Sequence, residues 1–287
     1  MDNPSSQERH RVSNSSEQLE FADYLLLEQQ QLYYVLHPTT QPLRARILLA
    51  GPFASERPHR YIPWVRWARH LANNGYEVMR FDYRGVGEST GQFEEYGLKP
   101  WSDDLRYCAE WLQQRSPTTP LILHGLGMGA LLSEKLFAQE IGHILLNWLP
   151  PKSARDMLYE QLKVKLSNNF SLPSSERKTR DQFIAELEGG KIIEVEGHNW
   201  TPHLWAEAAE FVFGSHPISD TNKRISHIGQ LDALAAHTFG GVGPNPLRGT
   251  GGASAMRLVN PDLSLCFSET TQWLNDALDS MKANGNA

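Results

Sequence analysis

Residues 121–130 read LILHGLGMGA, and this stretch decides which fold the sequence predicts. The short run LILH enters a turn bracketed by Gly125 and Gly129, and an apolar run beginning at Ala130 leaves it. A strand, a sharp turn and a helix in this order form a nucleophile elbow, whose usual sequence is G-x-S-x-G. The central position here is Gly127. The sequence therefore predicts the backbone of an elbow without its serine.

Strand and helix alternate on both sides of this elbow. Short apolar runs predict buried strands at 46–53, 76–83, 121–124 and 143–151. Amphipathic stripes predict helices between them, at 63–74, 101–115 and 130–140. Pro63 marks the expected start of the first helix, and Ser102 to Asp104 suit the start of the second. This alternation implies an α/β fold, a doubly wound and mostly parallel sheet with helices on both faces.

The flanking segments set the expected domain organisation. Residues 1–18 are rich in Ser, Asn, Gln and charge, which predicts a disordered tail. Residues 19–214 are expected to form the α/β domain. They include an antiparallel hairpin in YLLLEQQQLYYVLHP (24–38), two helices at 153–166 and 175–188, and a helix capped by Thr201 with Pro202 at its first position.

The C-terminal part is expected to return to the same domain. Residues 215–253 are dense in Gly and Pro near their end, and predict an irregular, Gly-rich linker or insertion. Residues 254–287 are expected to complete the domain, with a strand in AMRLVN (255–260) and a helix entered at Ser268.

Bulk properties narrow the class of protein. The 287 residues are 40% hydrophobic and carry a net charge of −6, with Lys and Arg scattered rather than clustered, so no nucleic-acid partner is expected. No apolar run approaches the roughly 18 residues of a membrane span. Two cysteines, in no metal-ligand spacing, indicate a reducing compartment, and the expected localisation is cytoplasmic, with no metal or cofactor.

The hairpin, the strand–helix pairs, the loop FDYRGVGEST (81–90) and the glycine elbow together resemble the α/β-hydrolase superfamily over about residues 20–150. Within that stretch, PFASERPHRY (52–61) and LILHGLGMGALL (121–132) look like the exosortase A system-associated hydrolase 2 group. The resemblance implies hydrolase ancestry, an elbow that commonly lacks serine, and a link to exopolysaccharide and PEP-CTERM sorting systems.

Acyl transfer on this fold needs a nucleophile, a histidine base, an acid and two backbone N–H groups that bind the oxyanion. The resemblance places those N–H groups at Met128 and in the Phe53 to Ala54 loop. Glycine at position 127 adopts the strained elbow conformation at little cost but removes the nucleophile.

The histidine base is missing by a separate observation. The superfamily carries it between the last strand and the last helix, yet RLVNPDLSLCF (257–267) contains none, and the last histidine of the chain is His237. Asp220, Asp232 and Asp262 are candidates for the acid, but without a partner a solvated or capping role is expected. We therefore expect a catalytically degenerate binding or accessory protein. The alternative is a hydrolase of ester, thioester or peptide bonds that uses a nucleophile outside the elbow.

Four further residues are candidates for a pocket near the elbow. Ser55, Glu56 and Arg60 belong to or follow the loop that would carry the second oxyanion N–H, where they could line a polar pocket. The alternative is that they are solvated residues of a surface loop. His124 directly precedes the first elbow glycine. Its two alternative roles are a buried histidine that is hydrogen-bonded to the backbone and a catalytic base. The expected ligand is a small molecule or an acyl or peptide group, and a protein partner is an open alternative.

Other motifs predict structural roles. Asp82 and Arg84 belong to the loop after a strand and are expected to organise it. Cys108 falls on the apolar stripe of its helix and is expected to be an inert core thiol. GLGMGA lacks the third glycine of G-x-G-x-x-G, which argues against a dinucleotide site.

Overall fold

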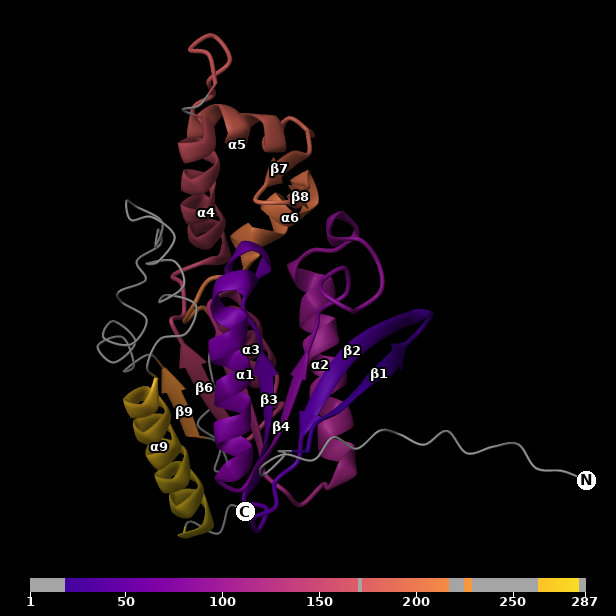
Figure 1. The fold of residues 1–287 in the computed structure, drawn as a ribbon, viewed down its shortest axis with the longest axis vertical. Coiled ribbons are helices and arrows are strands. Elements are labelled where there is room, and N and C mark those ends of the chain that lie inside the picture. The colour runs from indigo at the N-terminus through magenta and orange to yellow at the C-terminus, as the bar shows by residue number, and fades with distance from the viewer. Residues whose placement is uncertain (1–18, 170–171, 217–224, 229–262, 284–287) are drawn as a thin grey trace, which may run out of the picture.

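A computed structural model describes residues 19–169, 172–216, 225–228 and 263–283 of the chain. The sheet within these residues has seven strands in the order β1-β2-β4-β3-β5-β6-β9 (Figure 1). Its strands are β1 (Phe21–Leu27), β2 (Gln30–His37), β3 (Ala45–Ala50), β4 (Tyr76–Phe81), β5 (Leu121–Leu126), β6 (Ile144–Trp148) and β9 (Ile225–Ile228). The β1–β2 and β2–β4 pairs are antiparallel and all other pairs are parallel, so the predicted mostly parallel α/β sheet is confirmed.

Helices cover both faces of this sheet, as predicted (Figure 1). The helices α1 (Arg57–Asn73) and α9 (Ser264–Ala283) pack on one face, and α2 (Leu98–Arg115) and α3 (Met128–Ala138) pack on the other. Every residue of β3, β5 and β6 is buried. The continuous apolar runs of these strands reflect this two-sided burial.

Three helices begin earlier than their sequence patterns predict. α1 begins at Arg57, so Pro63 lies inside it rather than at its start. α2 begins at Leu98, because buried Leu98 and Trp101 extend its apolar stripe by another turn. α9 begins at Ser264, four residues before Ser268. A cap residue inside a helix gives the same sequence signal as one at its start, and only packing distinguishes the two.

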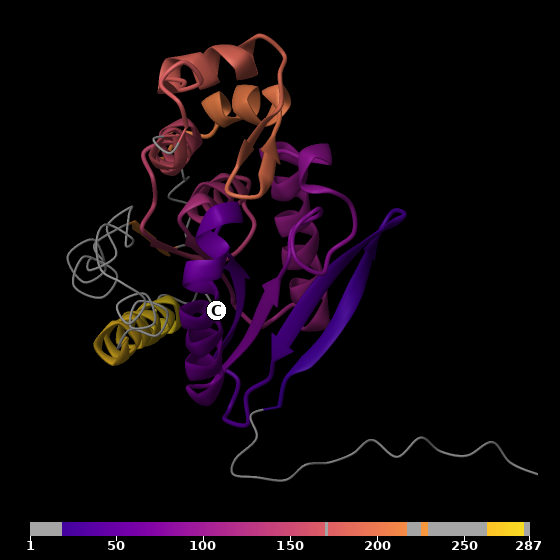
Figure 2. The same cartoon turned by 45° about the horizontal axis from the view of Figure 1, so that its top comes forward.

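A second layer lies above the carboxyl ends of the strands (Figure 2). We call it the cap layer, and it consists of α4 (Ala154–Asn169), α5 (Arg180–Glu188), β7 (Ile193–Val195), β8 (His198–Trp200) and α6 (Pro202–Glu207). The Thr201 hydroxyl accepts the Leu204 N–H at 3.1 Å and Pro202 follows it, as predicted. The antiparallel hairpin β7–β8 precedes this helix.

The segment 215–253, predicted as an irregular linker or insertion, contains the edge strand β9, which pairs in parallel with β6. Several predictions fall outside the described residues. These are the AMRLVN strand, the tail at 1–18, and the roles of Asp220, Asp232, His237 and Asp262.

Candidate functional site

The backbone at Gly127 forms a sharp turn between β5 and α3. Gly127 has φ 58° and ψ −119°, and its N–H donates to the Trp148 carbonyl at 3.0 Å. The flanking glycines are required by close packing: a Cβ on Gly125 would lie 2.4 Å from Ala130 Cα, and one on Gly129 would lie 2.2 Å from the Ala50 carbonyl oxygen. The elbow backbone that the sequence predicts is therefore present, with glycine at the position of the nucleophile.

The space beside Gly127 is filled by Glu56. A Cβ on Gly127 would lie 2.9 Å from Glu56 Oε2 and 3.5 Å from Met157 Cε. Oε2 is buried, while Oε1 forms an ion pair with Arg60 Nη2 at 3.1 Å. Glu56 comes from the short 3-10 turn η1 (Ala54–Glu56), at the carboxyl end of β3. Because β3 and β5 are neighbours, this turn faces the elbow directly.

The candidate oxyanion donors are backbone groups on the same edge of the sheet. Met128 is the first residue of α3, so its N–H has no partner within that helix. Phe53 has an extended backbone, and Ala54 has φ 37°, in the left-handed region that disfavours residues other than glycine. Of Ser55 only the backbone is described, within η1, and its side chain lies outside the described part of the structure.

His124 lies in an aromatic cluster under the elbow. Its ring centroid is 5.1 Å from that of Trp64 and 4.9 Å from that of Trp148, on the face of the sheet that α1 covers. Its Nδ1 is 3.0 Å from the Leu146 carbonyl oxygen. Burial lowers the pKa of the imidazole to about 3, so it stays neutral. The atoms nearest to a Cβ on Gly127 come instead from Glu56 and Met157. This geometry fits a structural histidine.

The loop after β4 is organised by two carboxylates. Asp82 accepts hydrogen bonds from Arg57 Nη2 at 2.6 Å and from the Glu88 N–H at 3.1 Å. Arg84 donates twice to Asp104, from Nε at 2.6 Å and from its backbone N–H at 2.9 Å. Burial raises the pKa of Asp104 to about 6, although Arg84 opposes the shift. The geometry of Asp82 and Arg84 is thus that of residues that hold a loop.

A pocket of about 730 Å³ opens between this loop, α1 and the cap layer. It adjoins Ala54, and its walls include Arg57, Tyr61, Ile62, Asp82, Glu88 and His198. Sequence reasoning found the neighbouring Glu56 and Arg60 but not Arg57 or Tyr61. These two residues lie in the quoted run PFASERPHRY, which the structure places partly in the first turns of α1, beside Asp82 and Arg80.

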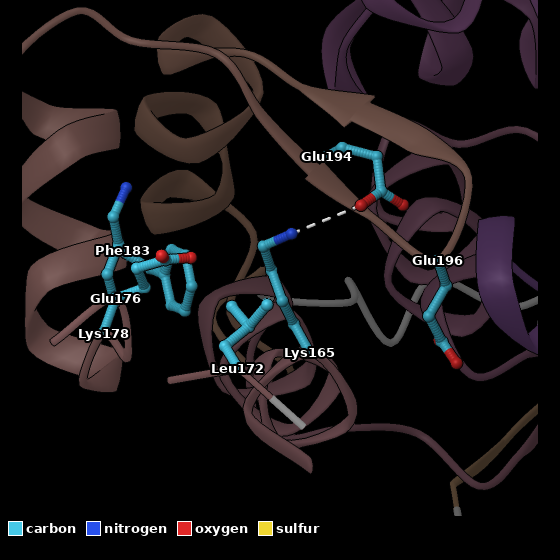
Figure 3. A pocket seen from close by; sticks show the side chains of 7 residues that line it. All are labelled: Lys165, Leu172, Glu176, Lys178, Phe183, Glu194 and Glu196. Carbon is cyan, nitrogen blue, oxygen red and sulfur yellow. Dashed lines mark hydrogen bonds and ion pairs between the residues drawn. The ribbon is translucent and has the colours of Figure 1, made fainter. Parts of the chain in front are cut away.

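A smaller pocket of about 310 Å³ lies within the cap layer (Figure 3). Lys165 donates to Glu194 at 3.2 Å, and the Lys165 ammonium lies 5.4 Å from the Phe183 ring centroid. Its lining residues come from α4, α5, β7 and the loops that follow α4 and β7. Its two lysines, Lys165 and Lys178, form ion pairs with Glu194 and Glu186. It is separate from the elbow.

In the described ranges, no cluster of three or more His, Cys, Asp or Glu side chains could hold a metal ion. None of the described helices combines the length and the apolar character needed to cross a membrane.

Known proteins resemble parts of this chain. Residues 59–144 match the family model described as serine aminopeptidase, S33. Human protein ABHD12B is 38% identical over 80 residues, which are 27% of this chain and 21% of that protein. The lysophosphatidylserine lipase ABHD12 of Danio rerio is 39% identical over 67 residues, 23% of this chain and 17% of that protein. The chain thus spans about a fifth of the length of these curated relatives.

Two solved structures illustrate the structural likeness. The α/β serine hydrolase XC6422 from Xanthomonas campestris has 27% identity and a TM-score of 0.41, covering 46% of this chain and 62% of that one. Est1E from Butyrivibrio proteoclasticus, solved with ferulic acid, has 16% identity and a TM-score of 0.48, covering 66% and 71%.

Proposed function

We propose that this chain of the α/β-hydrolase superfamily is a binding or accessory protein that has lost serine-hydrolase chemistry. The observation that carries the proposal is the Glu56 carboxylate, which lies 2.9 Å from the Cβ position of Gly127. A nucleophile is absent from the elbow, and the space that its side chain would need is occupied by an anionic group.

The missing base supports the same role. Serine attack requires an imidazole within hydrogen-bond reach of the hydroxyl. Residues 257–267, where the superfamily carries this histidine, contain none. His124 packs against Trp64 and Trp148 and is kept neutral by burial. Restoring the serine alone is therefore not expected to restore catalysis.

An ester-hydrolysis assay tests the proposal. The parent, Gly127→Ser and the double variant Gly127→Ser with Glu56→Ala are each incubated with p-nitrophenyl acetate and butyrate. We expect no turnover above that of a heat-denatured sample in all three, because residues 257–267 supply no histidine base. Parent turnover on the order of 1 s⁻¹ or faster, which is usual for enzymes, would contradict the proposal.

A second candidate function is a hydrolase that uses a group other than an elbow serine. The position of Glu56 favours it, since a carboxylate beside the first turn of α3 could accept a proton from an attacking water. In that case Glu56→Gln abolishes turnover in the same assay, and Glu160→Gln, an exposed control, does not. Equal rates in both variants would exclude Glu56 as the base.

The resemblance to the exosortase-associated group extends the proposal to cellular context. We place the protein in the cytoplasm, as an accessory to exopolysaccharide export or PEP-CTERM sorting. Deletion of the gene is expected to reduce the exported polymer or the sorted surface proteins. Unchanged amounts of both would argue against this context.

A further inference from the structure

We propose that the pocket beside Ala54 binds a small carboxylic acid with an apolar body, and that Arg57 recognises its carboxylate. The inference rests on the proposed binding role and names its ligand class. It depends on the pocket, on Arg57 and on the charges around them, and not on the elbow.

Arg57 is held in place by two neighbours. Its Nη2 donates to Asp82 Oδ1 at 2.6 Å, and its guanidinium carbon lies 5.0 Å from the Tyr61 ring centroid. The Asp82 side chain is 10% exposed, whereas that of Arg57 is 29% exposed. A guanidinium has five N–H donors in a planar fork. Asp82 accepts a hydrogen bond from one of these donors, and the exposed part of the guanidinium group lines the pocket.

Two guanidinium groups, those of Arg57 and Arg80, line the floor of the pocket. A recess of about 20 Å³ shares Arg57, Tyr61 and Asp82 with the pocket and is also lined by Arg80. Arg80 is buried and donates to the Tyr61 hydroxyl at 3.3 Å. Arg57 donates to Asp82, whereas Arg80 interacts with Glu20 as well. A second carboxylate of the pocket, Glu88, is exposed at the rim, where water and salt screen its charge.

The walls favour an apolar ligand body. Tyr61 and Ile62 are 36% and 43% exposed, and Val86 lines the wall contributed by the β4 loop. A volume of about 730 Å³ is within the range usual for small-molecule sites. A carboxylate forms two parallel hydrogen bonds with a guanidinium fork, while an ammonium or hydroxyl group cannot. The chemistry of the pocket thus selects an acid over an amine or alcohol of the same shape.

Calorimetric titration with three ligands of one skeleton tests this selection. The ligands are 3-phenylpropionate, 3-phenylpropanol and 3-phenylpropylamine, added to the full chain at pH 7. We expect the acid to bind at least tenfold more tightly than the other two. Equal or tighter binding of the amine or the alcohol, or no binding of the acid, would overturn the proposal.

Variants then assign the recognition group. Arg57→Ala is expected to weaken acid binding at least tenfold, and Arg57→Lys, which keeps a charge beside Asp82, to weaken it by less. Glu88→Gln is expected to leave binding unchanged or to tighten it about twofold. Lys163→Ala, in α4, is the control. If Arg57→Ala does not fold, Arg57→Lys decides, and parent-like affinity in that variant would contradict recognition by a guanidinium fork.

The same samples separate the two proposals. Ester turnover together with selective acid binding would overturn the proposal that the protein has lost hydrolase chemistry, but it would support the proposal that the pocket binds a carboxylic acid. The absence of both turnover and acid binding would overturn the proposed carboxylic-acid ligand, but it would support the proposal that the protein has lost hydrolase chemistry.

Discussion

At the elbow, the carboxylate of Glu56, from the turn after β3, lies 2.9 Å from the position that a Cβ at residue 127 would take. Glu56 and Gly127 are distant in sequence, and they meet because β3 and β5 are adjacent and parallel. Glycine serves this site twice: it tolerates φ 58°, and it leaves room for the carboxylate.

A double-mutant cycle measures this contact. Gly127→Ala is expected to lower the free energy of unfolding by roughly 1 to 3 kcal/mol, because it adds backbone strain and crowds Glu56. In a Glu56→Ala background the loss should be smaller by more than about 0.5 kcal/mol. Urea unfolding of the four proteins gives both numbers. Additive losses would show that the two residues do not touch.

His124 gives stability a pH dependence of known sign. Burial lowers its pKa from 6.5 to about 3, so the unfolded chain takes up a proton that the folded chain refuses. Stability from this group is fully present above pH 6.5 and is lost as the pH falls toward 3. Between pH 7 and pH 5 the parent should lose about 2 kcal/mol more than His124→Phe. Urea unfolding at both pH values checks this, and equal losses would mean that His124 titrates normally.

Among the elements, the loop after β4 and the helix α2 are joined by a buried ion pair. Asp104 is fully buried and accepts two hydrogen bonds from Arg84, whose Nη2 also donates to the Pro100 carbonyl at 3.1 Å. The loop is thereby fixed to the first turns of α2, and one wall of the 730 Å³ pocket depends on it.

Asp104→Asn should destabilise the protein by about 3 kcal/mol at pH 8, where the carboxyl group is ionised, because Arg84 would be left without its counter-charge. Its neighbour Asp103 is exposed, and Asp103→Asn should change the free energy of unfolding by less than about 0.5 kcal/mol. Thermal unfolding of the two variants compares them directly. Similar midpoints would argue against the ion pair.

The helices show which features of the fold the sequence could predict and which it could not. Periodicity identified α1, α2 and α9, because each buries a stripe of apolar side chains. It misplaced their starts, because Ser102 and Asp104 resemble cap residues but are buried within α2. Glu56 and Arg60 were found as site candidates by their position after a strand, whereas the approach of Glu56 to Gly127 depends on strand order, which no local pattern encodes.

Across the whole molecule, the sheet separates two hydrophobic cores. Cys108 lies in the core formed with α2 and α3, and Cys266 lies in the core formed with α1 and α9. Neither cysteine forms a disulfide, and both are buried. The C-terminal helix thus closes the second core, as its apolar stripe predicts, while the strand β9 inside the segment 215–253 carried no sequence signal strong enough to predict it.

This burial makes thiol reactivity a probe of global opening. Burial raises the pKa of the Cys108 thiol well above its usual value, which suppresses the thiolate. We expect Ellman's reagent to label neither thiol in the native protein within minutes, and to label both in 6 M guanidinium chloride. Fast native labelling of one thiol per chain would show that one of the two cores opens locally.

We propose that no serine in this chain is activated for acyl transfer. Intact-protein mass spectrometry after incubation with a fluorophosphonate probe tests it most directly, with a functional serine hydrolase treated in parallel. We predict that the parent and Gly127→Ser keep their unmodified masses while the control protein gains one adduct. A single stoichiometric adduct on the parent, mapped to one serine, would contradict the claim and name the residue that carries the chemistry.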